Sequence, residues 1–478
     1  MLVPLAALAV GLAACGGDDD GETTATTGAA ATTAAGGADT TAASETTEAS
    51  ETTGASDTTA ESETTTASDG TDAETTEPES TDAETTEPMT TDGVTTTAGG
   101  GGAAPSGDPI LIGVNTTLTG PLGVYGESIN EAVQFAVDEV NAEGGVLGRP
   151  VEVASSENDG TPESAVQGVE RVVQQDGATF VTGPITSAQV IAISERLEAL
   201  DAVFVNVTSK SDQVTGAACN ARLFQITSSD SMDLQAMTSA IEGSGVPNWA
   251  VLAADFAIGY DSVETFTAAA EAAGQTVSEP LFAPPGTEDY GTYITQLQES
   301  GADGLWLTLI GGDAVTFLTQ ASQFGLFDNF SVVMGTNTVT EPLFPALGPY
   351  IEGFVGPFSY YRTAVETPEN EEFVTAWEET YGDQPYFVDA DTYTGMQVLF
   401  QAIEAAGTDE PQAVADAMAS IEADSVYGTV TMRPGDHQLL RPTFVGSVVS
   451  AEGGLGWEVQ SAAPAEETSP EPNPECQL

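Results

Sequence analysis

The chain has 478 residues, of which 74 are acidic and 8 are basic, so its formal net charge at pH 7 is −66. A field of this sign repels nucleic acid and anionic lipid head groups, which excludes most phosphate-rich partners. The length exceeds one ordinary hydrophobic core, so more than one folded unit is expected.

The N-terminus has the pattern of a lipoprotein signal peptide. Residues 1–14 are uncharged and largely apolar, and the small residues Ala13 and Ala14 stand directly before Cys15. In this pattern the peptide is removed before the cysteine, and the thiol is acylated. We therefore expect Cys15 to carry a lipid that anchors the protein to the outer face of the cell membrane. The lack of basic residues before the apolar run suggests that the natural start lies upstream.

A long polar tract follows the cysteine. Residues 15–107 are dominated by Thr, Ala, Gly, Ser, Asp and Glu and contain no Lys or Arg, and the segment at 71–78 is repeated at 81–88. Such a composition cannot bury enough apolar surface to fold, so we expect a disordered, self-repelling linker. No later segment has the roughly eighteen apolar residues of a membrane-spanning helix, so the lipid is the expected membrane link.

Short apolar strands alternate with amphipathic helices from Pro109 onwards. Residues 110–114 form the first expected strand, and 127–141 form a helix with its apolar residues on one face. Thr161 and Pro162 offer an N-cap and a first-turn proline for the next helix. The remaining elements of this series are strands at 151–154, 178–182 and 203–207 and a helix over 187–200. This alternation predicts a parallel sheet with helices on both faces.

The same alternation restarts near Arg222. Its expected strands are 249–253, 304–309 and 331–334, and its expected helices are 261–273, 290–299 and 313–324. Two more helices are expected over 369–381 and 392–406, followed by strands at 428–432 and 443–449. The chain therefore predicts an α/β fold with two lobes.

Short motifs occur in a characteristic order between about residues 108 and 460. They are IGV at 112–114, LTGP at 118–121, YG at 125–126, VNAEGGVLGRPV at 140–151, VTGP at 181–184, GL at 325–326, MG at 334–335, VYG at 426–428 and DHQ at 436–438. The ordered set resembles the type I periplasmic solute-binding proteins of branched-chain amino acid and amide ABC importers. The lipoprotein signal would make this chain the lipid-anchored form.

The resemblance implies two Rossmann-like lobes with parallel sheets, joined by three hinge crossings, with the ligand in the cleft between them. The crossings would lie near Ile226, Phe358 and Gly428. The first lobe would comprise 108–226 and 358–428, the second 227–357 and 429–462, and 463–478 would be a C-terminal tail. Neither catalysis, a cofactor nor a metal is implied.

The first candidate site loop is Gly183–Ser187, between a strand and the helix after it. Ligands collect at the carboxyl ends of parallel strands, where helix N-termini offer free N–H groups. The hydroxyls of Thr186 and Ser187 could hold a carboxylate or carbonyl oxygen there, and in the resembling family the position of Ser187 contacts the ligand carboxylate. Ordinary helix capping by Ser187 is the alternative, and it is compatible with binding.

The second candidate loop contains Thr208, Ser209 and Lys210, at the family's second carboxylate-binding position. Lys210 is the only lysine of the chain, so it either attracts an anionic ligand or is a solvated surface lysine. Tyr125, in the expected first strand-to-helix loop, either lines the cleft or simply packs against its neighbours.

The resemblance places five residues on the opposite side of the cleft: Phe256, Ile258, Ile310, Gly311 and Asn337. Here the sequence departs from the family, because Asn337 stands where an amino-acid binder has a Glu, and aliphatic residues stand where it has tyrosines. An amide cannot give the charge-assisted bond that an ammonium needs. A carboxylate, an amide or another small polar solute with an apolar part is therefore expected, unless Asp255, Asp313 or Asp389 replaces the missing Glu.

The remaining reactive residues argue for binding rather than catalysis. His437, the only histidine, follows Arg-Pro-Gly-Asp in a turn and is expected at the surface. The chain has no Gly-x-Ser-x-Gly elbow, phosphate-binding loop or Cys/His metal spacing. Cys219 and Cys476, left over after acylation of Cys15, are expected to form a disulfide outside the cytoplasm.

Together these features predict an extracytoplasmic, lipid-anchored, monomeric solute-binding protein without enzymatic activity. It would capture an amino acid, an amide or a short carboxylate by closing its lobes, and deliver it to the permease of an ABC importer. Two alternatives use the same features: a ligand-sensing receptor with this fold, and a structural cell-wall lipoprotein.

Overall fold

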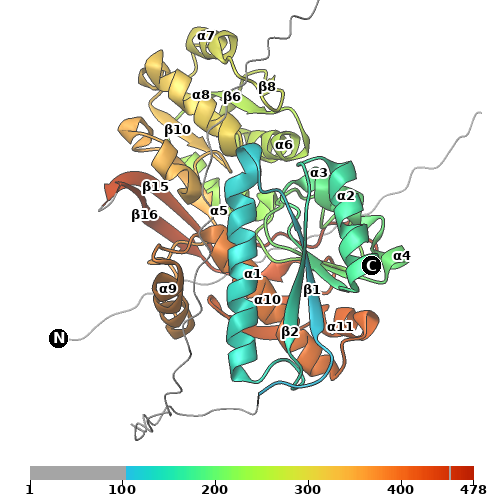
Figure 1. Cartoon of the computed structure of the whole chain (residues 1–478). Helices are drawn as coiled ribbons and strands as arrows, with labels where there is room; N and C mark the ends of the chain where they lie inside the picture. The colour runs from blue at the N-terminus through green and yellow to red at the C-terminus, as the bar shows by residue number, and fades with distance from the viewer. Residues whose placement is uncertain (1–103, 452–453) are drawn as a thin grey trace, which may run out of the picture. The chain divides into compact units, whose positions relative to one another are not determined.

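Five parallel strands rich in Val, Ile and Phe form the first sheet of the structure, a computed structural model that describes residues 104–451 and 454–478 (Figure 1). The strand order is β2-β1-β3-β4-β5. The strands are β1 (Ile110–Thr116), β2 (Val151–Glu157), β3 (Phe180–Thr182), β4 (Val203–Asn206) and β5 (Leu223–Gln225). The expected signal peptide and Cys15 lie outside the described residues, as does the expected linker up to residue 103.

Seven helices belong to this part of the described chain: α1 (Gly123–Glu143), α2 (Pro162–Arg171), α3 (Ser187–Ser194), α4 (Leu197–Leu200), α9 (Pro368–Tyr381), α10 (Phe387–Ala406) and α11 (Pro411–Met418). Helix α2 begins as predicted, because the Thr161 side chain accepts a hydrogen bond from Ser164 N and Pro162 is its first residue. Aromatic contacts join helices far apart in the sequence: Phe135 of α1 lies 5.4 Å from Trp377 of α9 and 5.5 Å from Tyr393 of α10, between ring centroids.

The second sheet is mixed rather than purely parallel. Its order is β16-β15-β11-β10-β9-β6-β7, with β8 also paired to β6. Strand β15 pairs antiparallel with both β11 and β16, which corrects the expectation of a parallel sheet at this edge. The strands are β6 (Asn248–Ala254), β7 (Thr276–Val277), β8 (Leu281–Ala283), β9 (Gly304–Thr308), β10 (Val332–Gly335), β11 (Val355–Phe358), β15 (Thr443–Ala451) and β16 (Gly454–Ala463).

Helices α5 (Asp230–Gly243), α6 (Ala257–Ala272), α7 (Gly291–Glu299) and α8 (Gly311–Gln323) accompany the second sheet (Figure 1). Aromatic packing fixes α6 on it, since Phe266 stacks on Trp306 of β9 with ring centroids 4.1 Å apart. A short third sheet contains β12 (Glu422–Ser425), β13 (Gly428–Met432) and β14 (Leu439–Leu440). Among the described residues, no helix combines the length and the apolar character that crossing a membrane requires.

A buried arginine joins the segments that pass between the first and second sheets. Arg441 lies between β14 and β15, and its guanidinium donates to the carbonyl oxygens of Ile226 (3.1 Å) and Ser359 (2.9 Å). It also forms an ion pair with Asp391 of α10 at 2.9 Å, and both side chains are completely buried. Two of the predicted crossings, near Ile226 and Phe358, therefore lie next to one cation. The lobe boundaries themselves stay a prediction.

His437 is not the surface residue that its turn suggested. It is 4% exposed, and its ring stacks on Phe224 of β5 with centroids 4.4 Å apart. Gln438, next to it, forms a β-bridge with Gln225, so this turn docks against the edge of the first sheet and covers the imidazole. Burial lowers the pKa of His437 below its usual value of 6.5.

The replacement His437→Asn should make folding stability less sensitive to acid. Because the pKa of His437 is depressed in the folded state, the unfolded chain takes up the proton first as the pH falls. The stability that the neutral, buried imidazole contributes is therefore lost as the pH falls through about 6.5 and below. Asn tolerates the left-handed φ of 56° at this position and does not titrate. Urea unfolding of both proteins from about pH 8 to about pH 5 measures the difference. A stability difference between them that is constant over this range would contradict the prediction.

Candidate functional site

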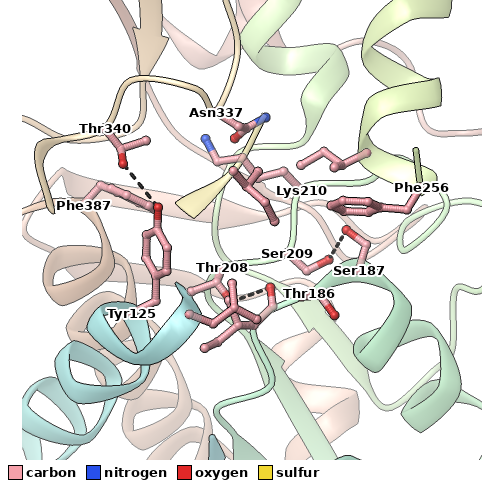
Figure 2. Close-up of a pocket in the computed structure, with 14 residues that line it drawn as sticks. Tyr125, Thr186, Ser187, Thr208, Ser209, Lys210, Phe256, Asn337, Thr340 and Phe387 are labelled. Atoms are coloured by element: carbon pink, nitrogen blue, oxygen red, sulfur yellow. Dashed lines mark hydrogen bonds between the residues drawn. The ribbon is translucent and has the colours of Figure 1, made fainter. Parts of the chain in front are cut away.

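One pocket of the described chain collects loops from both sheets at the starts of five helices (Figure 2). These helices are α1, α3, α6, α8 and α10, and their N-termini carry partial positive charge that favours an anion. The lining residues are Leu122, Tyr125, Ile185, Thr186, Ser187, Thr208, Ser209, Lys210, Phe256, Ile258, Ile310, Asn337, Thr340 and Phe387.

The start of α3 presents hydroxyl groups to this pocket. The Thr186 side chain accepts from Gln189 N, and the Gln189 side chain accepts in return from Thr186 N at 2.9 Å, which completes a capping box. Capping is therefore done by Thr186, and Ser187 is the first residue of the helix. The Ser187 hydroxyl accepts from the Ser209 hydroxyl at 3.0 Å. The two candidate loops of the sequence thus meet at this pair.

Asn206, the last residue of β4, holds the second loop in shape. Its side-chain oxygen accepts from Ser209 N at 3.1 Å, and its amide donates to Ser209 O at 2.9 Å. Thr208 donates from its hydroxyl to Pro184 O at 3.2 Å, which links this loop to the first. Both loops are therefore held in shape by the protein's own hydrogen bonds, which reduces the entropy that ligand binding costs.

Lys210 is buried and paired, so it is not a solvated surface lysine. Its ammonium donates to Asp233 at 2.7 Å and to Ser228 at 3.2 Å, and it lies 5.8 Å from the centroid of the Phe387 ring. The lysine and Asp233 side chains are 7% and 1% exposed. An ammonium has three N–H groups, so these two bonds leave one for a ligand.

Tyr125 lies in the first turn of α1 rather than in the loop before it. Its hydroxyl is 3.3 Å from the Thr340 hydroxyl, on the side of the second sheet. Burial raises the pKa of this phenol above its usual 10.0, so the group stays protonated and can donate. Gly311, the first residue of α8, is the one predicted ligand-binding residue outside the pocket lining.

The second-sheet side of the pocket is apolar apart from the Thr340 hydroxyl and one amide. Phe256 precedes α6, Ile258 is in its first turn, and Ile310 precedes α8. Asn337 has a left-handed φ of 60°, and its amide donates to buried Asp230 at 3.1 Å. Burial raises the pKa of Asp230 well above its usual 3.8. With its N–H₂ group turned to Asp230, Asn337 has its side-chain oxygen available as an acceptor.

The acids proposed as substitutes for the missing glutamate have other partners. Asp255 accepts from Tyr260, Asp313 from Gly286 N at 2.9 Å, and Asp389 from Tyr386 N at 2.9 Å. Within the described part of the chain, no Asp or Glu lines the pocket. Among the same residues, no His, Cys, Asp and Glu cluster could hold a metal ion.

Ten of the eleven predicted ligand-binding residues line this one pocket, and four lining residues were missed. Ile185 adjoins predicted Thr186 in the sequence, and Leu122 lies in η1 (Gly120–Leu122), directly before α1. Thr340 and Phe387 reach the pocket only through the tertiary fold. That these residues bind a ligand stays a prediction.

Residues 109–454 match the sequence profile of a family described as "Periplasmic binding protein". The chain belongs to the periplasmic binding protein family. Among curated periplasmic binding protein relatives, the Leu/Ile/Val-binding protein homolog 8 of Brucella abortus (strain 2308) is 29% identical over 322 residues, which cover 64% of this chain and 78% of the relative. The predicted resemblance is thereby confirmed.

Solved structures of periplasmic binding proteins agree on the fold. An ABC transporter substrate-binding protein from Sphaerobacter thermophilus is 26% identical, with a TM-score of 0.67 over 75% of this chain and 98% of that one. The solute-binding protein of an ABC transporter from Rhodopseudomonas palustris BisB5, in complex with 3,4-dihydroxybenzoic acid, is 18% identical, with a TM-score of 0.69 over 75% and 98%. The predicted type I, two-lobed α/β fold is confirmed.

Proposed function

We propose that this protein is the extracytoplasmic solute-binding component of an ABC importer, and that its solute is a small carboxylate with an apolar body. The observation that carries the proposal is the composition of the pocket lining. Ser187, Ser209 and Lys210 supply hydrogen-bond donors, and aromatic and aliphatic side chains such as Phe256 supply apolar surface beside them (Figure 2). Among the described residues, the lining of this pocket contains no Asp or Glu, which favours a carboxylate over an ammonium group; Glu341 lines a neighbouring cavity that shares Lys210, Asn337, Thr340 and Phe387 with it.

The carboxylate would lie against the start of α3 and the Ser187–Ser209 pair, where hydroxyls, backbone N–H groups and the helix dipole all favour a negative charge. The body of the solute would pack among Phe256, Ile258 and Ile310. Because these contacts come from both lobes, the solute binds the closed arrangement better than the open one and shifts the protein toward it.

A branched-chain amino acid is the second candidate. It is favoured by the curated relative, whose printed name describes a Leu/Ile/Val-binding protein homolog. The fold neighbour from Rhodopseudomonas palustris was solved with an aromatic acid instead. The two candidates differ in the ammonium group, so a single comparison separates them.

Titration calorimetry with benzoate, benzamide and leucine tests the proposal. We expect benzoate to bind at least about tenfold more tightly than benzamide or leucine, because a hydrogen bond to a charged group contributes about 1.5–3 kcal/mol. Ser187→Ala should weaken benzoate by about tenfold for the same reason. The matched control is Ser194→Ala, in the same helix but outside the pocket, whose hydroxyl donates to Ile191 O at 2.7 Å. Leucine binding more tightly than benzoate would favour the amino-acid alternative.

We also propose that an acylated Cys15 anchors the protein to the membrane and that the acidic linker gives the binding domain its reach. The motif before the cysteine and the composition of residues 15–107 support this. Metabolic labelling with a fatty-acid analogue should mark the wild type. Cys15→Ser should abolish the label and release the protein from the membrane fraction; equal labelling of the two would contradict the proposal.

A further inference from the structure

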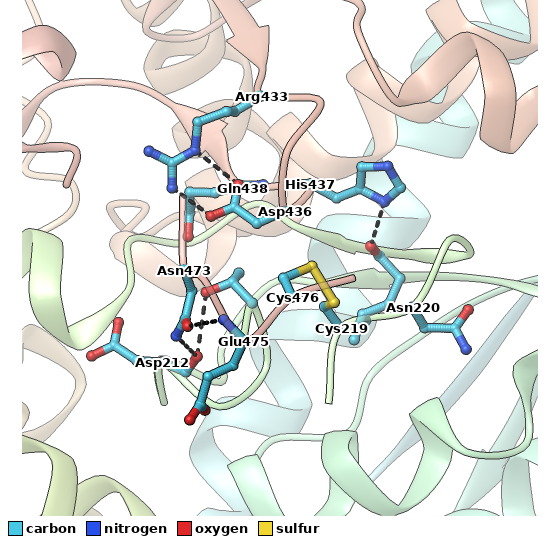
Figure 3. Close-up of a disulfide and its surroundings, with 12 residues drawn as sticks. Asp212, Cys219, Asn220, Arg433, Asp436, His437, Gln438, Asn473, Glu475 and Cys476 are labelled. Atoms are coloured by element: carbon cyan, nitrogen blue, oxygen red, sulfur yellow. Dashed lines mark hydrogen bonds and ion pairs between the residues drawn. A yellow bond between two sulfur atoms is a disulfide. The ribbon is translucent and has the colours of Figure 1, made fainter. Parts of the chain in front are cut away.

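The C-terminal tail runs from the second sheet back to the first. Strand β16, which pairs with β15 in the second sheet, ends at Ala463, and the short helix α12 (Ala465–Thr468) then packs against α5. Cys476, near the end of the tail, is joined by a disulfide to Cys219, with Cα atoms 5.5 Å apart (Figure 3). Cys219 lies between β4 and β5 of the first sheet. We call residues 464–476 the strap.

The middle of the strap is fixed on the turn between β13 and β14. Arg433 forms an ion pair with Asp436 at 2.6 Å and donates to the carbonyl oxygen of Pro470. Gly435 leaves room for Pro472, because a Cβ on this glycine would lie 3.0 Å from the proline ring. Both contacts hold the strap beside the segment that leads into Arg441 and β15.

The end of the strap contacts the loop that follows the ligand-binding residues. Asn473 donates to Asp212 O at 3.4 Å, two residues after Lys210 (Figure 3). Gly216 of the same loop allows this approach, because a Cβ there would come within 2.5 Å of the Asn473 amide. The disulfide at Cys219 is therefore the last of several contacts that the strap makes with the continuation of the ligand-binding loop.

The segment that follows Lys210 also lies where the two lobes meet, at the edge of the cleft. Ser211 donates to Asp261 of α6, whose first turn lines the ligand pocket. A cavity beside this contact is lined by Asp212 and Gln213, by Asp261, Glu264 and Thr265 of α6, and by Asn473, Pro474 and Glu475 of the strap. The strap thus lies against both sides of the junction.

We propose that the strap is a fourth, covalently closed connection between the lobes, which limits how far the cleft opens and positions the loop carrying Ser209 and Lys210. In a fold joined by three crossings, separation of the lobes is limited by the hinge alone. Here any rotation of the second sheet away from the first must also move β16, and the strap transmits that movement to Cys219. The strap therefore favours the closed arrangement and slows the escape of the solute, a role that rests on the proposed function.

Small-angle X-ray scattering of the full chain without solute tests the restraint directly. Dithiothreitol opens the bond by two exchange steps, which leave both cysteines as thiols and the reagent as its cyclic disulfide. We expect the reduced wild type and the Cys219→Ser/Cys476→Ser variant to have a larger radius of gyration than the oxidised protein. Stopped-flow measurement should show benzoate leaving roughly tenfold faster, since the bias toward the closed state is lost.

The double variant supplies the control, because dithiothreitol should not change it further. A second full-chain variant carries a protease recognition sequence after Ser469, so that the strap is cut while the disulfide and the fold remain; it should behave like the reduced protein. Unchanged scattering after both reduction and cutting would overturn the proposal. If benzoate does not bind at all, the proposed function fails, while scattering still decides whether the strap restrains the lobes.

Discussion

Replacement of Arg441 by methionine is expected to lower the free energy of unfolding by about 3–5 kcal/mol, because it leaves a buried carboxylate without its cation. Arg441 and Asp391 are both completely buried, and Asp391 also accepts from Tyr427 at 2.6 Å and from Ser359 at 3.2 Å. These two hydrogen bonds hold the carboxylate in place, so it cannot turn toward water when the guanidinium is removed. The carbonyl oxygens of Ile226 and Ser359 lose their donors in the same step.

Urea unfolding measures this loss, and Arg196→Met is its matched control. Arg196 pairs with Glu170 at the surface, where the two side chains are 52% and 28% exposed. An exposed pair contributes less than about 1 kcal/mol, so the control should unfold almost like the wild type. Similar losses in the two variants would contradict the prediction, because the buried pair would then contribute no more to stability than an exposed one. The double variant Arg441→Met/Asp391→Asn should recover part of the loss, because it removes the unpaired charge as well.

Lys210→Met is expected to weaken benzoate binding at least about tenfold and to change benzamide binding little, since a charge-assisted hydrogen bond contributes about 1.5–3 kcal/mol. The single change removes the cation and also frees the negative charge of Asp233, 2.7 Å away, to repel an anionic solute. It should lower the free energy of unfolding by about 3–5 kcal/mol, because Asp233 is buried.

Calorimetry on the double variant Lys210→Met/Asp233→Asn separates two ways in which the lysine can act. If the ammonium bonds the solute directly, benzoate binding stays weak in the double variant. If the lysine only neutralises Asp233, removal of both charges restores the affinity. Equal affinities of benzoate for the wild type and for Lys210→Met would refute the prediction altogether.

The order and type of most elements could be predicted, but several helix starts could not. Helix α10 was expected from residue 392 and begins at Phe387, because its cap uses Tyr386 and Asp389 in place of the usual Ser, Thr, Asn or Asp at the first position. Helix α1 was expected from residue 127 and begins at Gly123, after the turn of η1. Strands β11 and β16 were missed, although each pairs with the predicted strand β15.

The site was predictable where it follows the strand ends and unpredictable where it depends on distant contacts. Ser187 and Ser209 each follow a buried strand by a few residues, so their convergence follows from the topology of a parallel sheet. Phe387 is far along the chain and reaches the pocket because α10 packs along α1. The burial of His437 depends in the same way on the docking of its turn against β5, a contact that no local pattern reports.

The disulfide also has a consequence for export. Cys219 and Cys476 are 257 positions apart, and every strand of the second sheet lies between them. A chain that emerges N-terminus first therefore exposes Cys219 as an unpaired thiol until the last of these strands has crossed the membrane. Oxidation of the two cysteines is then a late step of maturation, because the disulfide forms only when the C-terminal tail has placed Cys476 beside Cys219 on the folded domain.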